Sequence, residues 1–107
     1  MIDRYDYCNT NDENGNPAGG KVSGKGLTIR WQNGPLGRGK DRIEPNGAFV
    51  ETVIDAARQR IEYYQESVFK CRENALAITK LEEALLWLNS RTQRRESQGT
   101  EGTHRGN

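Results

Sequence analysis

The sequence predicts an α+β fold in which a small antiparallel strand layer packs with a long hairpin of two antiparallel helices. Apolar and polar residues alternate strictly over residues 27–32, which is the period of a strand. Two later segments repeat their apolar residues with the period of a helix, and the short link 65–68 between them favours an antiparallel hairpin. Because only 33% of the 107 residues are hydrophobic, one chain buries a modest core, and we expect the protein to be oligomeric.

The first 26 residues differ in composition from the rest. They are rich in Asn, Asp and Gly, with turn-forming sequences at residues 14–17 and 19–20. We predict that residues 1–26 form an irregular N-terminal arm. Residues 27–107 are then predicted to be a single strand-plus-hairpin domain that ends in a C-terminal flap.

The loop after the predicted strand is rich in glycine and charge. We expect a short return strand near Arg42 and Ile43. Residues 34–40 have the Gly and Lys spacing of a phosphate-binding loop, but Asp41 stands where a magnesium-binding hydroxyl belongs, and no helix follows at once. We interpret this segment as an ordinary turn.

The two helices carry the clearest patterns. The first is predicted to begin at residues 45–47, with Asn46 as its N-cap. The second is predicted to run from Cys71 to about Arg91 and to be apolar on two sides. Its main stripe consists of Ala77, Ile78, Leu81, Ala84, Leu85 and Leu88, and the opposite side carries Ala75, Leu76, Leu86 and Trp87. One neighbour should be the first helix, and the other either the strand layer or a second copy of the chain.

Composition narrows the functional class. A net charge of +1 argues against a protein that mainly coats polyphosphate. The two cysteines, Cys8 and Cys71, do not suggest a disulfide framework. Neither an apolar signal segment nor a membrane-length apolar run occurs, so we expect a soluble cytoplasmic protein.

Polar and aromatic residues gather where the second helix starts. Asn74 falls on the apolar stripe, where an amide needs hydrogen-bond partners. It either forms a capping or interhelix bond or faces a ligand. Tyr63, Tyr64 and Phe69 crowd the same turn, and they either stack on a planar base or belong to the core.

The end of the second helix is basic and leads into a glycine-containing tail. Arg91, Arg94 and Arg95 either oppose the helix dipole or bind phosphate through paired hydrogen bonds. The tail that closes over such a ligand would use Glu101, Gly102, Thr103 and His104. Since the sequence offers no nucleophile motif, metal cluster or carboxylate pair, we predict a binder that does not turn its ligand over and needs no cofactor.

Four segments together resemble the phage-encoded anti-Thoeris sponge family. They are residues 27–35, residues 46–47 with 53–54, residues 71–88, and residues 91–104. The resemblance implies a dimer, in some members a trimer of dimers. It also implies sequestration of the cyclic ADP-ribose isomers, such as glyco-cyclic ADP-ribose, that TIR-domain enzymes make, which inhibits Thoeris defence in the host bacterial cytoplasm.

The resemblance also implies roles for single residues. Tyr64 would stack on adenine, Asn74 would contact the ligand, Arg91 would pack on the base or hold the pyrophosphate, and residues 101–104 would form the flap. Some members carry a second site for cyclic oligonucleotides, for which Arg30, Arg38 and Lys40 are the candidates. Two other classes stay open: a small nucleic-acid-binding adaptor that uses the arginine-rich helix end, and a nucleotide hydrolase.

Overall fold

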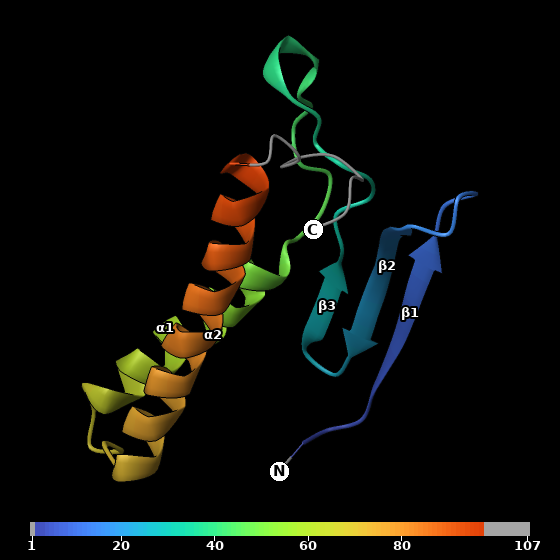
Figure 1. The fold of residues 1–107 in the computed structure, drawn as a ribbon. Helices are drawn as coiled ribbons and strands as arrows, with labels where there is room; N and C mark the ends of the chain where they lie inside the picture. Colours follow the sequence, from blue (N-terminus) through green and yellow to red (C-terminus); the bar gives the residue numbers. More distant parts are fainter. Residues whose placement is uncertain (1, 98–107) are drawn as a thin grey trace. The chain divides into compact units, whose positions relative to one another are not determined.

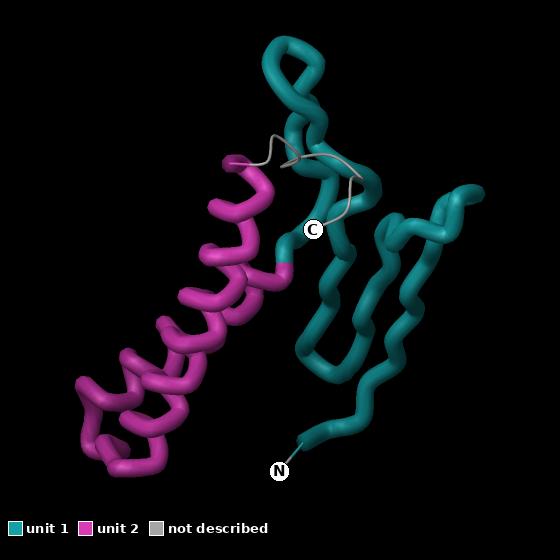
Figure 2. The backbone as a smooth tube through the Cα atoms, viewed as in Figure 1, with its two compact units in different colours: residues 1–49, 100–106 teal, residues 50–99, 107 magenta. Residues whose placement is uncertain are grey.

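The computed structural model describes residues 2–97. These form, in chain order, the elements β1 (Tyr5–Asn11), β2 (Pro17–Gly24), β3 (Leu27–Arg30), the 3-10 turn η1 (Gly39–Asp41), α1 (Val50–Gln65) and α2 (Arg72–Ser97) (Figure 1). A three-stranded antiparallel sheet and two contacting helices confirm the predicted α+β class. The described residues divide into two compact units, residues 2–49 with the sheet and residues 50–97 with the helices (Figure 2).

The prediction of an irregular arm over residues 1–26 is wrong for most of that segment. β1 pairs antiparallel with β2, with Tyr5 opposite Gly24 and Asn9 opposite Gly20. Every residue of β1 is exposed, so the strand has no buried face and none of the apolar alternation that reveals a strand in a sequence. Backbone hydrogen bonds to β2, rather than apolar burial, define β1.

A glycine that looked like a turn signal instead permits this pairing. Gly20 has a φ of +124°, and a Cβ atom there would lie 2.4 Å from the carbonyl oxygen of Cys8 on β1. Only glycine combines that dihedral angle with so close an approach. Glycine in this segment therefore marks a tight strand contact.

β3 confirms the predicted strand, although it ends at Arg30. It pairs with β2, and Trp31 then forms an isolated parallel bridge with Ala48. The return strand expected near Arg42 and Ile43 is wrong. The loop instead closes on itself through η1 and a 2.7 Å hydrogen bond from the Ile43 N–H to the Leu36 carbonyl.

The prediction that Asn46 caps the first helix is also wrong, because α1 begins only at Val50. The Asn46 Oδ1 atom accepts the Asn33 N–H at 2.8 Å, and its Nδ2 donates to the Asn33 carbonyl at 3.1 Å. The Asn46 N–H donates to Gln32 Oε1 at 2.9 Å. Asn46 thus ties together the two ends of the loop that follows β3.

The helical unit is the predicted hairpin. Its main stripe is half-buried where α2 packs against α1, as predicted, at Ala77, Ile78, Leu81, Ala84, Leu85 and Leu88. The opposite side is open: Leu76 is 45% exposed, and Leu86 and Trp87 are each 70% exposed. Within residues 2–97 no hydrophobic side chain is fully buried. The second apolar side of α2 therefore has the exposure expected of a surface that associates with another molecule.

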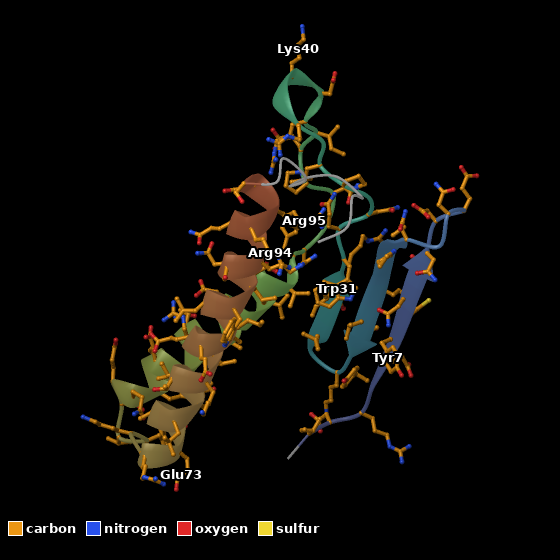
Figure 3. The ribbon with its side chains drawn as sticks, in the orientation of Figure 1. Tyr7, Trp31, Lys40, Glu73, Arg94 and Arg95 are labelled. Atoms are coloured by element: carbon orange, nitrogen blue, oxygen red, sulfur yellow. The ribbon has the colours of Figure 1, made fainter. Side chains whose placement is uncertain are left out.

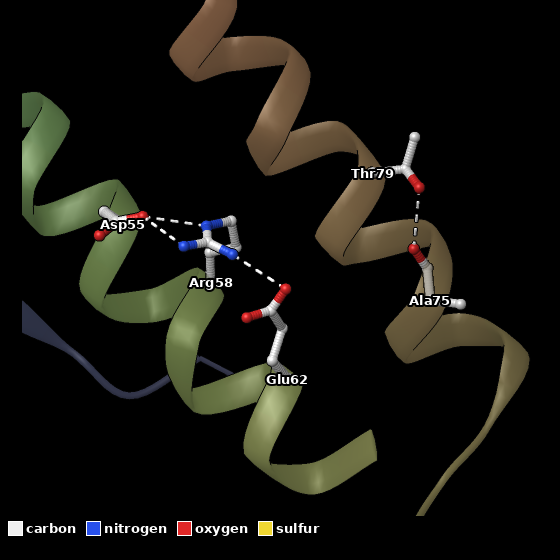
Figure 4. Close-up of polar contacts among 5 residues, drawn as sticks. All are labelled: Asp55, Arg58, Glu62, Ala75 and Thr79. Atoms are coloured by element: carbon white, nitrogen blue, oxygen red, sulfur yellow. Dashed lines mark hydrogen bonds and ion pairs between the residues drawn. The ribbon is translucent and has the colours of Figure 1, made fainter. Parts of the chain in front are cut away.

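Local polar contacts link neighbouring turns within each helix. Arg58 of α1 lies 2.8 Å from Asp55 and 2.9 Å from Glu62, and on α2 the Thr79 hydroxyl donates to the Ala75 carbonyl at 3.1 Å (Figure 4). The hydrogen bond to Asp55 contributes most to raising the pKa of Arg58.

Neither helix, over the range described, has the length and apolar character needed to cross a membrane.

Candidate functional site

The turn between α1 and α2 is fixed by side chains that bond across it. Gln65 accepts the Cys71 N–H at 2.9 Å through Oε1 and donates to the Cys71 carbonyl at 3.1 Å through Nε2. The Ser67 hydroxyl donates to the Tyr64 carbonyl at 2.5 Å and accepts the Phe69 N–H at 3.1 Å. These bonds satisfy backbone groups that a helix end leaves without partners, and they stabilise the turn.

Asn74 belongs to this turn. It is half-buried in the first turn of α2, and its Nδ2 donates to the Phe69 carbonyl at 3.3 Å. The local hydrogen bond that the sequence allowed is therefore present. Its effect is to connect Asn74 directly to the aromatic segment.

The aromatic residues at the turn face solvent rather than a core. The exposed fractions are 54% for Tyr63, 38% for Tyr64 and 73% for Phe69. The ring centroids of Tyr63 and Tyr64 lie 6.3 Å apart with their planes tilted by 53°. Tyr64, Phe69 and Asn74 thus meet at one end of the hairpin, with aromatic surface accessible to a planar ligand.

Arg60, which the sequence reasoning did not select, lies beside these rings. Its guanidinium carbon is 5.0 Å from the Tyr63 centroid and 5.1 Å from the Tyr64 centroid. Its Nε donates to the Tyr64 hydroxyl at 3.3 Å, and this hydrogen bond is the main cause that raises the pKa of Arg60. Arg60 precedes Tyr64 by one helical turn, so the spacing could have revealed the pair.

The predicted arginine cluster lies at the other end of α2. Figure 3 shows Glu73 at one end of the helix and Arg94 and Arg95 at the other. Asn74 and Arg91 lie about 25 Å apart along α2, because an α-helix rises 1.5 Å per residue. One chain therefore does not bring Arg91 and Arg95 to the aromatic end. The predicted flap residues Glu101, Gly102, Thr103 and His104 lie outside the described residues.

The three candidates for a second site, Arg30, Arg38 and Lys40, do not line one common depression. Arg30 lines an open depression of about 540 Å³ in the sheet unit, together with Lys21 and Trp31. Lys21 is opposite Arg30 in the register of β2 and β3. Arg38 and Lys40 do not line this depression, and Lys40 lies at the tip of the neighbouring loop (Figure 3). The sequence did not indicate Lys21 as a candidate, because strand β2, which positions it, was not predicted.

Residues 24–93 match the model of the Acb2/Tad1 hairpin domain family. The chain belongs to the Acb2/Tad1 hairpin family. This match confirms the resemblance described above, and it includes α1, the hairpin turn and α2 as far as residue 93. Tyr64, Phe69, Asn74 and Arg91 therefore lie within the family domain, whereas Arg95 and residues 101–104 lie beyond it.

The chain is also similar to Thoeris anti-defense 1 of Bacillus phage SBSphiJ7. It is 50% identical to this chain over 82 residues. The alignment covers 77% of this chain and 55% of the relative, so the chain spans about half the length of that protein.

Proposed function

We propose that this Acb2/Tad1-family protein sequesters cyclic ADP-ribose-type signalling nucleotides, releases them unchanged, and thereby inhibits bacterial Thoeris defence in the host cytoplasm. The observation that carries the proposal is the exposed aromatic cluster on a hairpin turn closed by side-chain hydrogen bonds. Solvent-exposed rings are costly to leave uncovered, and a purine face can cover them. The name of the phage relative supports the same biological role.

The roles of the turn residues follow from their positions. Tyr64 offers a ring face for the adenine, and Phe69 offers a second apolar surface at the same turn. Asn74, already bonded to the Phe69 carbonyl, contributes an amide that bonds a polar edge of the ligand. The remaining requirement is positive charge for the pyrophosphate.

Arg91 and Arg95 meet this requirement only if two copies of the chain associate. On one helix Arg91 is about 25 Å from Asn74. Two antiparallel copies, however, would place the turn of one hairpin beside the arginines of the other. We therefore infer that the complete site forms between subunits, in a dimer that is able to assemble further.

The open side of α2 is the surface through which this association is expected. Changing both Leu86 and Trp87 to Glu should convert the protein to monomers, because each side chain is 70% exposed and offers apolar area for a partner. Light scattering coupled to gel filtration measures the mass, and circular dichroism should show an intact hairpin. A wild-type protein that is already monomeric at micromolar concentration would contradict the inference.

Calorimetry with purified cyclic ADP-ribose isomers tests the proposed function. We expect saturable binding with a fixed stoichiometry and weak dependence on salt. The alternative, a nucleic-acid-binding adaptor acting through the basic end of α2, requires binding to many sequences that weakens steeply with salt. A hydrolase would instead return a chemically altered ligand.

A second site for cyclic oligonucleotides is proposed around Arg30 and Lys21. These register partners present two cations to one depression, and neither pairs with a carboxylate among residues 2–97. Adjacent like charges repel each other, and an anion bound between them would offset this repulsion. Changing both to Ala should weaken the binding of a cyclic oligonucleotide at least about tenfold, since each cation contributes a charge-assisted contact. Calorimetry with the matched Arg38 and Lys40 double variant decides the location, because a loss only in that variant would place the site on the loop.

A further inference from the structure

Arg60 differs from its neighbour Arg58 in how its charge is compensated. Arg58 contacts two carboxylates, those of Asp55 and Glu62. Arg60 contacts the rings of Tyr63 and Tyr64 and the Tyr64 hydroxyl, and no carboxylate pairs with it among residues 2–97. Among residues 2–97, carboxylates therefore neutralise the charge of Arg58 but not the charge of Arg60.

The geometry leaves the anion-binding part of Arg60 available. A guanidinium group has five N–H donors, and here Nε–H is directed to the Tyr64 hydroxyl. The two terminal amino groups make no hydrogen bond to the described residues. Paired amino groups of this kind match two oxygens of one phosphate. Contact with the Tyr63 and Tyr64 rings also orders the long side chain before a ligand arrives, which lowers the entropic cost of binding.

We infer that Arg60 is a phosphate-binding residue of the hairpin-turn site, contacting the pyrophosphate of a nucleotide whose base stacks on Tyr64 of the same chain. The inference rests on the proposed function and adds a residue to its site. It also supplies positive charge at the aromatic end, where the distant Arg91 of the same chain contributes none. In a dimer, Arg60 from one copy and Arg91 from the other would approach the ligand from two chains.

Four proteins and two probes test this assignment. The proteins are the wild type, Arg60→Gln, Arg60→Lys and the matched control Arg58→Gln. The probes are cyclic ADP-ribose, followed by calorimetry, and uncharged adenosine, followed through the tyrosine ring resonances by NMR at millimolar concentration. We expect Arg60→Gln to bind cyclic ADP-ribose about 10- to 100-fold more weakly, the range for one hydrogen-bonded charge. Adenosine binding should not change, and Arg60→Lys should fall between Arg60→Gln and the wild type.

The outcomes separate this inference from the proposed function. Equal affinity of Arg60→Gln and wild type for cyclic ADP-ribose would overturn the role of Arg60 and leave the proposed function standing. An equal loss for both probes would show that Arg60 only orients Tyr64, which also overturns the phosphate role. A wild-type protein that binds neither probe would defeat the proposed function and this inference together. Arg58→Gln loses two carboxylate contacts of a side chain that is only 23% exposed, so it should melt no higher than Arg60→Gln. Circular dichroism should show that both variants are folded at the temperature of the binding experiment.

Discussion

Replacing Leu81 with Asp is expected to unfold the helical hairpin at room temperature. Leu81 lies at the middle of the half-buried stripe that packs on α1. A carboxylate there loses the apolar contact and must either lose its hydration or separate the helices, at a cost of about 2 to 4 kcal/mol. A hairpin with no fully buried hydrophobic side chain among the described residues has little stability in reserve.

Far-UV circular dichroism and thermal melting measure this effect. Lys80→Asp is the matched control, because it introduces the same residue at the adjacent position, where the side chain is 76% exposed. Lys80 forms an ion pair with Glu83 at 3.7 Å, and an exposed pair of this kind contributes about 1 kcal/mol at most. If the two variants melt at the same temperature, the seam between the helices does not run through Leu81.

The second large effect is expected at Tyr64. Changing Tyr64 to Ala should weaken binding of cyclic ADP-ribose about 5- to 150-fold, which corresponds to the ~1 to 3 kcal/mol of one base stacked on an aromatic ring. The hairpin should remain folded, because Tyr64 is already 38% exposed. Calorimetry on the variant gives the change in affinity.

Tyr64→Phe is the control for this substitution. It keeps the ring and removes only the hydroxyl that accepts a 3.3 Å hydrogen bond from Arg60. We expect affinity close to that of the wild type, with any small loss arising from a less ordered Arg60. Equal losses in Tyr64→Phe and Tyr64→Ala would mean that the hydroxyl, rather than the ring face, carries the interaction.

The helices were predictable because burial leaves a periodic trace in the sequence. Leu81 and Leu85 recur on one face of α2, and that face is the one that α1 covers. The end of α2 was placed too early, at about Arg91, although the helix continues to Ser97. The arginines of this segment are good helix formers, and the sequence pattern of apolar residues ends before the helix does.

The sheet was predictable only in part. β3 alternates apolar and polar residues, whereas β1 is exposed throughout and leaves no such trace. Gly20 was interpreted as a turn residue, yet its missing side chain allows the backbone to approach the Cys8 carbonyl closely. Such contacts between distant segments depend on tertiary structure, which local patterns do not encode.

The candidate site shows the same division. Sequence reasoning selected Tyr64, Phe69 and Asn74, which the structure brings together at the hairpin turn. It also placed Arg91 in the same site, although the length of α2 keeps Arg91 about 25 Å from Asn74 on one chain. Arg60 was overlooked because a charged residue on the polar side of a helix has no pattern of its own. Its role depends on the two rings beside it.

Recovery of captured ligand tests sequestration most directly. The purified protein is incubated with a cyclic ADP-ribose isomer, separated from free ligand by rapid gel filtration, and heated to unfold it. Mass spectrometry then identifies and quantifies what is released. We predict the original nucleotide, unchanged in mass and in a constant ratio to protein, with much less recovered from Tyr64→Ala. Release of a hydrolysed product, or of no nucleotide at all from the wild-type protein, would contradict capture without turnover.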